Sequence, residues 1–166
     1  ALIGRDIDKL MKLLVDIELR MFKGLNLRVV FLQNIITDLL LGYDVKEIFQ
    51  SYSAYIKEKY NAIPGFITAN MPFLYNKLAQ WDISEVVLCS AINKIGYQMS
   101  PNISAYVDIL KTNDVNKYQI MAMSTLASGA IPAKEAYEFI NLLDIQSVVF
   151  GASTEEHIME TVNLIK

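Results

Sequence analysis

Two short segments of small and hydroxyl-bearing residues lie in the last third of the chain, and each follows an apolar run. The first is STLASG (Ser124–Gly129) and the second is GAS (Gly151–Ser153). Each precedes an amphipathic segment typical of a helix. A helix N-terminus presents unpaired backbone N–H groups and the positive end of a dipole, so these segments could bind an anion. The pair therefore predicts a phosphate-binding site. The alternative is an ordinary pair of turns, with Ser128 and Thr154 as helix caps.

Neutral hydrogen-bonding side chains follow the other apolar runs of the chain. We expect four of them to line a substrate pocket: Gln33, Asn34, Asn70 and Asn93. Amide side chains both donate and accept hydrogen bonds, but they do not act as general bases. This set therefore predicts binding of a polar ligand and assigns no catalytic residue. Strand-to-helix turns and helix caps are the alternative interpretation.

Three further side chains have reactive groups, but their sequence context indicates no specific catalytic role. Asp38, in NIITDLLLG, is the best-placed carboxylate because it follows a predicted strand, although helix capping also explains it. His157 falls inside the last predicted helix, where a structural or solvent-facing role is the better interpretation. Cys89 has apolar neighbours and no adjacent basic residue, which argues against an activated thiolate. One histidine and one cysteine exclude a Cys/His zinc site, so we expect no metal.

The elements that must position these residues alternate between strands and helices. Near-continuous apolar runs predict strands over 27–33, 65–70, 85–90, 118–123 and 147–152. Helical spacing predicts helices over 6–22, 44–60, 72–81, 102–111, 133–143 and 154–165. We expect Gly24 to end the first helix, and Asp44 with Glu47 to form a capping box at the second. Strands that are apolar throughout are typical of a parallel sheet covered on both faces.

This alternation predicts an α/β fold of parallel (β/α) units that fills one domain over residues 1–166. Either an open, flavodoxin-like doubly wound sheet or part of a (β/α)₈ barrel fits the pattern. A complete barrel takes about 250 residues, so 166 residues supply a little over half. No GxGxxG follows the first strand, which disfavours the dinucleotide-binding open sheet. We therefore expect a partial or incomplete TIM-barrel-like domain that could be the later part of a longer barrel.

The composition of the chain argues against some classes of binding partner. A net charge of −3 without a basic stripe argues against nucleic acid, and no apolar stretch approaches the roughly 18 residues of a membrane span. A single cysteine excludes a disulfide framework and fits a cytoplasmic location. The unpaired strand edges of a partial barrel need cover, so we expect a homo-oligomer.

The two glycine-containing loops resemble the C-terminal part of the aldo-keto reductase superfamily. AMSTLASGAI is similar to its strand-end pattern aromatic-Ser-Pro-Leu-x-x-Gly, and VVFGASTEEHIMETV is similar to its final Pro-Gly-Ala-Ser-Ser-x-Glu-Gln-Leu-x-Glu-Asn segment. The resemblance implies a (β/α)₈ barrel that binds NADP or NAD. It implies the following cofactor-binding residues: Ser124, Leu126 and Gly129 over the pyrophosphate, Gly151, Ala152 and Ser153 near the adenosine phosphate, and Glu160 at the adenine ribose. We expect Ser128, a small residue of the same loop, to join this set.

The catalytic residues of that superfamily are not carried over by this resemblance. Its Asp, Tyr, Lys and His lie in the first half of the barrel, and Gln33 or Asn34 stands where its His would fall. The motif also departs at Thr125 and Phe150, where the family has proline. The resemblance therefore implies a phosphate-bearing ligand such as a nicotinamide dinucleotide, with any oxidoreductase activity dependent on residues outside this chain. The alternative is a binding or assembly module without redox activity.

Overall fold

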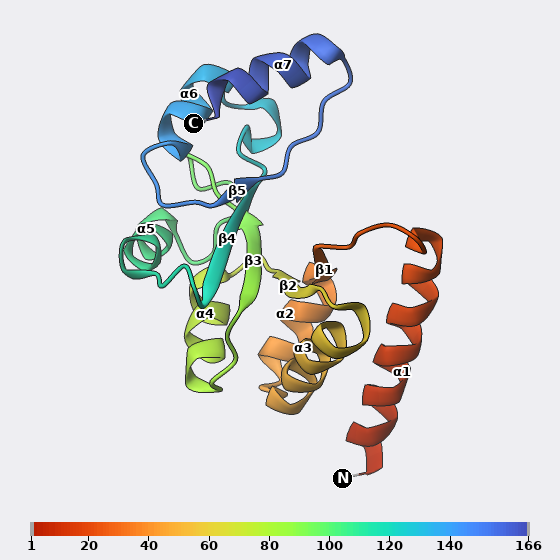
Figure 1. The fold of residues 1–166 in the computed structure, drawn as a ribbon. Helices are drawn as coiled ribbons and strands as arrows, with labels where there is room; N and C mark the ends of the chain where they lie inside the picture. Colours follow the sequence, from red (N-terminus) through yellow and green to blue (C-terminus); the bar gives the residue numbers. More distant parts are fainter. Residues whose placement is uncertain (1, 166) are drawn as a thin grey trace.

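One parallel sheet of five strands organises the protein (Figure 1). The computed structural model describes the backbone of residues 2–165 and the side chains of residues 6–165. The strands are β1 (Val29–Leu32), β2 (Ile63–Ile67), β3 (Val86–Ala91), β4 (Tyr118–Met123) and β5 (Ser147–Val148). They pair in chain order, β1-β2-β3-β4-β5, and every pair is parallel. The predicted α/β fold of parallel (β/α) units is confirmed.

Helices precede, connect and follow the strands. They are α1 (Leu2–Leu19), α2 (Asn34–Gly42), α3 (Lys46–Tyr60), α4 (Met71–Gln80), α5 (Ile103–Thr112), α6 (Ala133–Ile140) and α7 (Glu155–Leu164). Two 3₁₀ turns, η1 (Arg20–Phe22) and η2 (Ala127–Gly129), follow α1 and β4. Because parallel strands need a crossover, each connection within the sheet carries at least one α-helix.

The strand order decides between the two predicted architectures. A doubly wound sheet reverses its strand order at a switch point, whereas a barrel adds each strand beside the last. The sequential order found here excludes the flavodoxin-like alternative. The barrel is not closed, because β1 pairs only with β2 and β5 only with β4 in the part of the chain described. The structure is thus an incomplete barrel-type sheet.

Right-handed crossovers between strands in sequential order place the connecting helices on one face of the sheet. In β1, Val30 and Leu32 are buried while Val29 and Phe31 are half-buried. β4 alternates in the same way, and only the central strand β3 is buried at every position. The expectation of cover on both faces is therefore wrong for β1 and β4, because the open barrel leaves its concave face without helices.

The core lies between the sheet and the helices on its covered face. Phe66 of β2 is fully buried, with ring centroids 5.2 Å from Phe49 and 5.5 Å from Tyr52 on α3. The Tyr52 hydroxyl donates to the Val30 carbonyl at 2.8 Å, so its burial leaves no unpaired hydroxyl. Burial raises the pKa of Tyr52 well above its ordinary value. These contacts fix α3 across β1 and β2.

Three local predictions are resolved by the backbone. Gly24 adopts φ +89° and ends the first helical segment as expected. Asp44 has φ +57° and its carboxylate binds Lys77 across the fold, so the capping box with Glu47 is wrong. Helix α2 was not predicted, because NIITDLLLG is too uniformly apolar to show helical spacing. β5 stops at Val148, four residues earlier than expected.

Candidate functional site

A cavity of about 520 Å³ lies at the carboxyl ends of β1 to β4, and we call it the carboxyl-end pocket. Carboxyl ends of parallel strands are where barrel-type sheets carry their sites. The lining comes from the strand ends and from the loop between β3 and α5. It consists of Asn34, Thr68, Ala69, Ala91, Gly96, Gln98, Met99, Ser100, Pro101 and Met123. None of these side chains is charged, so the pocket offers neutral hydrogen-bonding groups beside methionine and alanine surface.

A carboxylate supports the β2 edge of this pocket. Asp38 of α2 accepts a hydrogen bond from the Thr68 hydroxyl at 2.5 Å and another from the Ala69 N–H at 3.0 Å. The Thr68 hydroxyl in turn accepts the Asn70 N–H at 3.0 Å. Because Asp38 lies within α2 and binds the end of β2, the helix-capping interpretation is wrong. Its two oxygens already hold the turn that forms the pocket wall.

Two buried hydroxyl groups lie beneath the same wall. Ser90 Oγ donates to the Thr68 carbonyl at 2.8 Å and lies 3.1 Å from Tyr106 Oη. The Tyr106 hydroxyl also donates to the Ala69 carbonyl and accepts the Met71 N–H. Burial raises the pKa of Tyr106, so its phenol stays protonated at neutral pH. A phenol and a carbonyl cannot act as the base that a serine nucleophile needs. The pair therefore supports the pocket wall by holding the Thr68 and Ala69 carbonyls.

The four predicted pocket residues have different places. Asn34 lines the pocket, and Gln33 precedes it as an exposed residue without a side-chain cap bond. Asn70 Oδ1 accepts the Phe73 N–H at 3.2 Å, so it caps α4 as the alternative interpretation held. Asn93 is fully buried and binds both backbone groups of Tyr97 at 2.8 Å. It therefore positions the loop over the pocket.

The STLASG segment forms a tight turn built on η2. Ser124, Ala127 and Ser128 have φ of +52°, +48° and +59°, and Gly129 has φ +88°. The N–H groups of residues 127, 129, 130 and 131 donate to carbonyls of residues 124, 126 and 127. The half-buried Leu126 packs beside Ala127 and Ile131. Of the six STLASG amides, those of Ala127 and Gly129 are thus used within the turn. Ser128 lies outside α6, which begins after Pro132, so Ser128 is not its cap.

The second predicted loop runs away from the sheet toward α7 (Figure 1). Gly151, Ala152 and Ser153 are exposed, as are His157 and Glu160 on α7. Thr154 Oγ1 accepts the His157 N–H at 3.2 Å, which confirms Thr154 as the cap. Neither this loop nor the STLASG turn lines the carboxyl-end pocket. The predicted phosphate loops therefore contribute no side chain to the pocket lining, which reaches Met123 next to the STLASG turn.

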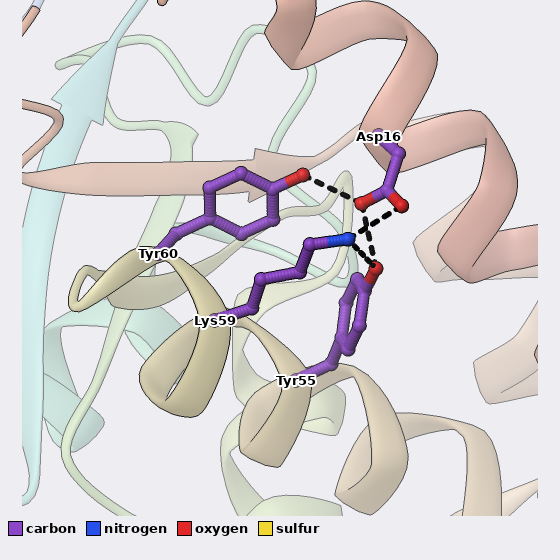
Figure 2. A network of polar contacts seen from close by, with 4 residues as sticks. All are labelled: Asp16, Tyr55, Lys59 and Tyr60. Carbon is purple, nitrogen blue, oxygen red and sulfur yellow. Dashed lines mark hydrogen bonds and ion pairs between the residues drawn. The ribbon is translucent and has the colours of Figure 1, made fainter. Parts of the chain in front are cut away.

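A polar network missed from the sequence lies at the opposite, amino-terminal end of the sheet, where Asp16 of α1 meets α3 (Figure 2). Its carboxylate accepts hydrogen bonds of 2.6 Å from Lys59, Tyr55 and Tyr60. These bonds, that from Lys59 foremost, lower the pKa of Asp16 to about 2. Burial and the Asp16 carboxylate raise the pKa of Tyr60 to about 12. With every member paired, the network anchors α1. The only signal in the sequence is the polar-aromatic string YIKEKY.

Two properties of the described residues bear on function. Among residues 2–165, no cluster of three or more His, Cys, Asp or Glu side chains could hold a metal ion. None of the helices described is long and apolar enough to cross a membrane. Comparisons with protein families, curated proteins and solved structures give no match to this chain.

Proposed function

We propose that this protein binds a small, uncharged, polar molecule in the carboxyl-end pocket and performs no redox chemistry of its own. The observation that carries this proposal is the pocket lining, in which ten uncharged residues surround about 520 Å³. A ligand phosphate or carboxylate would find no cation there to neutralise it. A neutral ligand with hydrogen-bonding groups along one side and apolar surface on the other fits these walls.

Two side chains are available to orient such a ligand. Within residues 6–165, the Asn34 amide and the Ser100 hydroxyl have no hydrogen-bond partner in the protein, and both face the pocket. Thr68 and Asn93 are engaged elsewhere, by Asp38 and by the Tyr97 backbone. Asn34 and Ser100 can therefore form hydrogen bonds with the ligand, while the hydrogen bonds of Thr68 and Asn93 hold the pocket walls. Met99 and Met123 supply an adaptable apolar surface.

A titration of pocket variants tests this proposal. Amide NMR spectra would be recorded with a panel of neutral polyols, amides and hydroxy-ketones. We expect at least one of these classes to shift the resonances of residues 96–101, and Asn34→Leu with Ser100→Ala to abolish that shift. Ser153→Ala, an exposed serine outside the pocket, is the matched control and should leave binding unchanged. Absence of saturable shifts at millimolar concentration for every class would refute the proposal.

The second candidate is a nicotinamide dinucleotide held by the loops that resemble those of aldo-keto reductases. Two observations favour it: Ser128 and Gly129 are exposed beside open space, and Gly151–Ser153 precede the capped N-terminus of α7. Against it stands the use of the Ala127 and Gly129 amides within the turn itself. Ser124, Leu126 and Glu160 would complete this cofactor set. Chemistry would then depend on residues outside this chain.

The same NMR experiment separates the two candidates. NADPH, NADH and inorganic phosphate would be titrated against the protein and against Ser128→Glu, which places a negative charge beside the proposed pyrophosphate position. Dinucleotide binding predicts saturable shifts at residues 124–129 and 151–154 and their loss in Ser128→Glu. Absence of these shifts would contradict the dinucleotide candidate, and shifts at residues 96–101 with the neutral panel alone would support the first proposal.

A further inference from the structure

Helix α1 packs on the domain with only one of its faces. Met11 is buried, and Val15 and Leu19 pack beside it against the core. Two carboxylates of the same face reach α3, where Asp8 accepts a hydrogen bond from Ser51 and Asp16 binds the network of Figure 2. The helix stands at the edge of the molecule with α3 beside it (Figure 1). Its remaining face has no cover from the other residues that the structure describes.

That outer face carries a continuous apolar stripe, which we call the α1 seam. It consists of Ile7, Leu10, Leu14 and Ile17 of α1 and Met21 of the following turn η1, which are exposed by 44%, 54%, 51%, 49% and 80%. Successive members are three or four residues apart, which is the a/d spacing of a coiled coil. Five aligned large apolar residues in water are far from the scattered exposed side chains of an ordinary surface and mark an interaction site.

The charges beside the seam indicate what covers it. Asp6 and Arg20 flank the seam on the same side, one at each end, and both are exposed. Neither forms a salt bridge in the described part of the chain. Asp6 occupies a g position of the α1 heptad, and Arg20, the first residue of η1, takes the g position when the heptad is continued past Leu19. In an antiparallel helix pair, g positions face g positions. A second copy of α1 running antiparallel therefore brings Asp6 to Arg20 twice, once at each end.

We infer that two copies of this chain associate through their α1 seams as an antiparallel, two-fold symmetric helix pair. In this register Ile7 packs against Ile17 of the second copy, and Leu10 packs against Leu14. Each layer of the helix interface therefore pairs two isoleucines or two leucines. Leu13, 52% exposed, meets its own copy next to the two-fold axis. A parallel pair would instead place Leu13 beside Glu18 and would leave Asp6 and Arg20 at opposite ends without a partner. The same residues therefore specify both the partner and its direction.

Sedimentation velocity of the whole chain tests the association. We expect a dimer whose dissociation constant rises at least roughly 100-fold in Leu14→Asp, because each dimer would bury two unpaired carboxylates. Leu142→Asp is the matched control, since Leu142 is 84% exposed on a different surface, and it should leave the dimer intact. Circular dichroism would verify that both variants fold. A wild-type monomer, or a dimer indifferent to Leu14→Asp, would overturn the inference.

Charge exchange and cross-linking test the direction. Asp6→Arg and Arg20→Asp should each weaken the dimer, and the double variant should restore it. Under mild oxidation, Leu13→Cys should form a disulfide-linked dimer and Ile7→Cys should not. Native Cys89 is 3% exposed and does not interfere. Cross-linking through Ile7→Cys would show a parallel pair, and failure of the double variant to recover would show that Asp6 and Arg20 do not meet. Either result overturns the antiparallel arrangement.

Discussion

The Thr68 hydroxyl donates to the Asp38 carboxylate at 2.5 Å, and this bond joins α2 to the end of β2. Thr68 is fully buried, so its hydroxyl has no access to solvent as a substitute partner. The second oxygen of Asp38 holds the Ala69 N–H. This relationship fixes the wall of the carboxyl-end pocket and couples pocket shape to the stability of the fold.

Asp38→Ala should destabilise the protein. The change leaves a buried hydroxyl and a backbone N–H without their acceptor, which costs about 1–3 kcal/mol in the free energy of unfolding. Urea unfolding followed by circular dichroism measures this difference. Asp108→Ala is the control. Asp108 is exposed, and its ion pair with Lys111 is long at 4.0 Å. This substitution should change the free energy of unfolding by no more than about 0.5 kcal/mol. Equal effects of the two substitutions would contradict the assigned role of Asp38.

Gly65→Ala should also destabilise the protein. A Cβ at this position would lie 2.5 Å from a ring carbon of Phe31 and 3.0 Å from Val29 on the neighbouring strand. The Phe31 ring must move, at a cost of about 1–3 kcal/mol in the free energy of unfolding. In a Phe31→Ala background the same change should cost much less, which thermal or urea unfolding would reveal.

Gly42→Ala provides the control for that steric argument. No atom lies within 4 Å of a Cβ at Gly42, and the residue is the last of α2. Alanine loses less backbone entropy on folding than glycine, so this variant should be neutral or more stable by up to about 1 kcal/mol. A loss of stability comparable with that of Gly65→Ala would show that the Phe31 contact is not the cause.

Acid should weaken the attachment of α1. Hydrogen bonds from Lys59, Tyr55 and Tyr60 lower the pKa of Asp16 from 3.8 to about 2 in the folded protein. A lowered folded-state pKa contributes stability above the unfolded value, and this contribution is lost as the pH falls from about 4 to about 2. Asp16→Asn should therefore be less stable than the wild type at neutral pH, and the difference should shrink toward pH 2. Unfolding curves collected across this pH range would test the sign, and a constant difference would contradict it.

Cys89 should resist alkylation in the folded protein. Its side chain is 3% exposed, and burial raises the thiol pKa from 9.0 to about 11. The thiolate is the reactive form, so the two-unit rise alone slows reaction at pH 8 by roughly 100-fold. Mass spectrometry after iodoacetamide treatment, with and without denaturant, gives both rates. Similar rates in the two conditions would contradict the burial of this thiol.

The sequence by itself determined most of the elements and some of the local motifs of this protein, although it missed α2 and the end of β5. Apolar runs such as Tyr118–Met123 formed strands because a buried extended backbone must pair with a neighbour, and β4 has those bounds. Gly24 and Thr154 were predictable because a left-handed turn and a helix cap involve only residues a few positions apart. The α/β class followed from the alternation of these elements.

Only the tertiary structure decided the strand order, the pocket and the two faces of α1. Asp38 and Thr68 are 30 residues apart in the chain, and Asp16 and Lys59 are 43 residues apart. No local sequence pattern therefore predicts either contact. Asp44 was expected to cap its own helix and instead binds Lys77. Helical periodicity showed that α1 is apolar at its core positions, but it could not say which apolar positions the domain would leave in water. Burial depends on which elements pack together, and that is set by contacts between residues far apart in the chain.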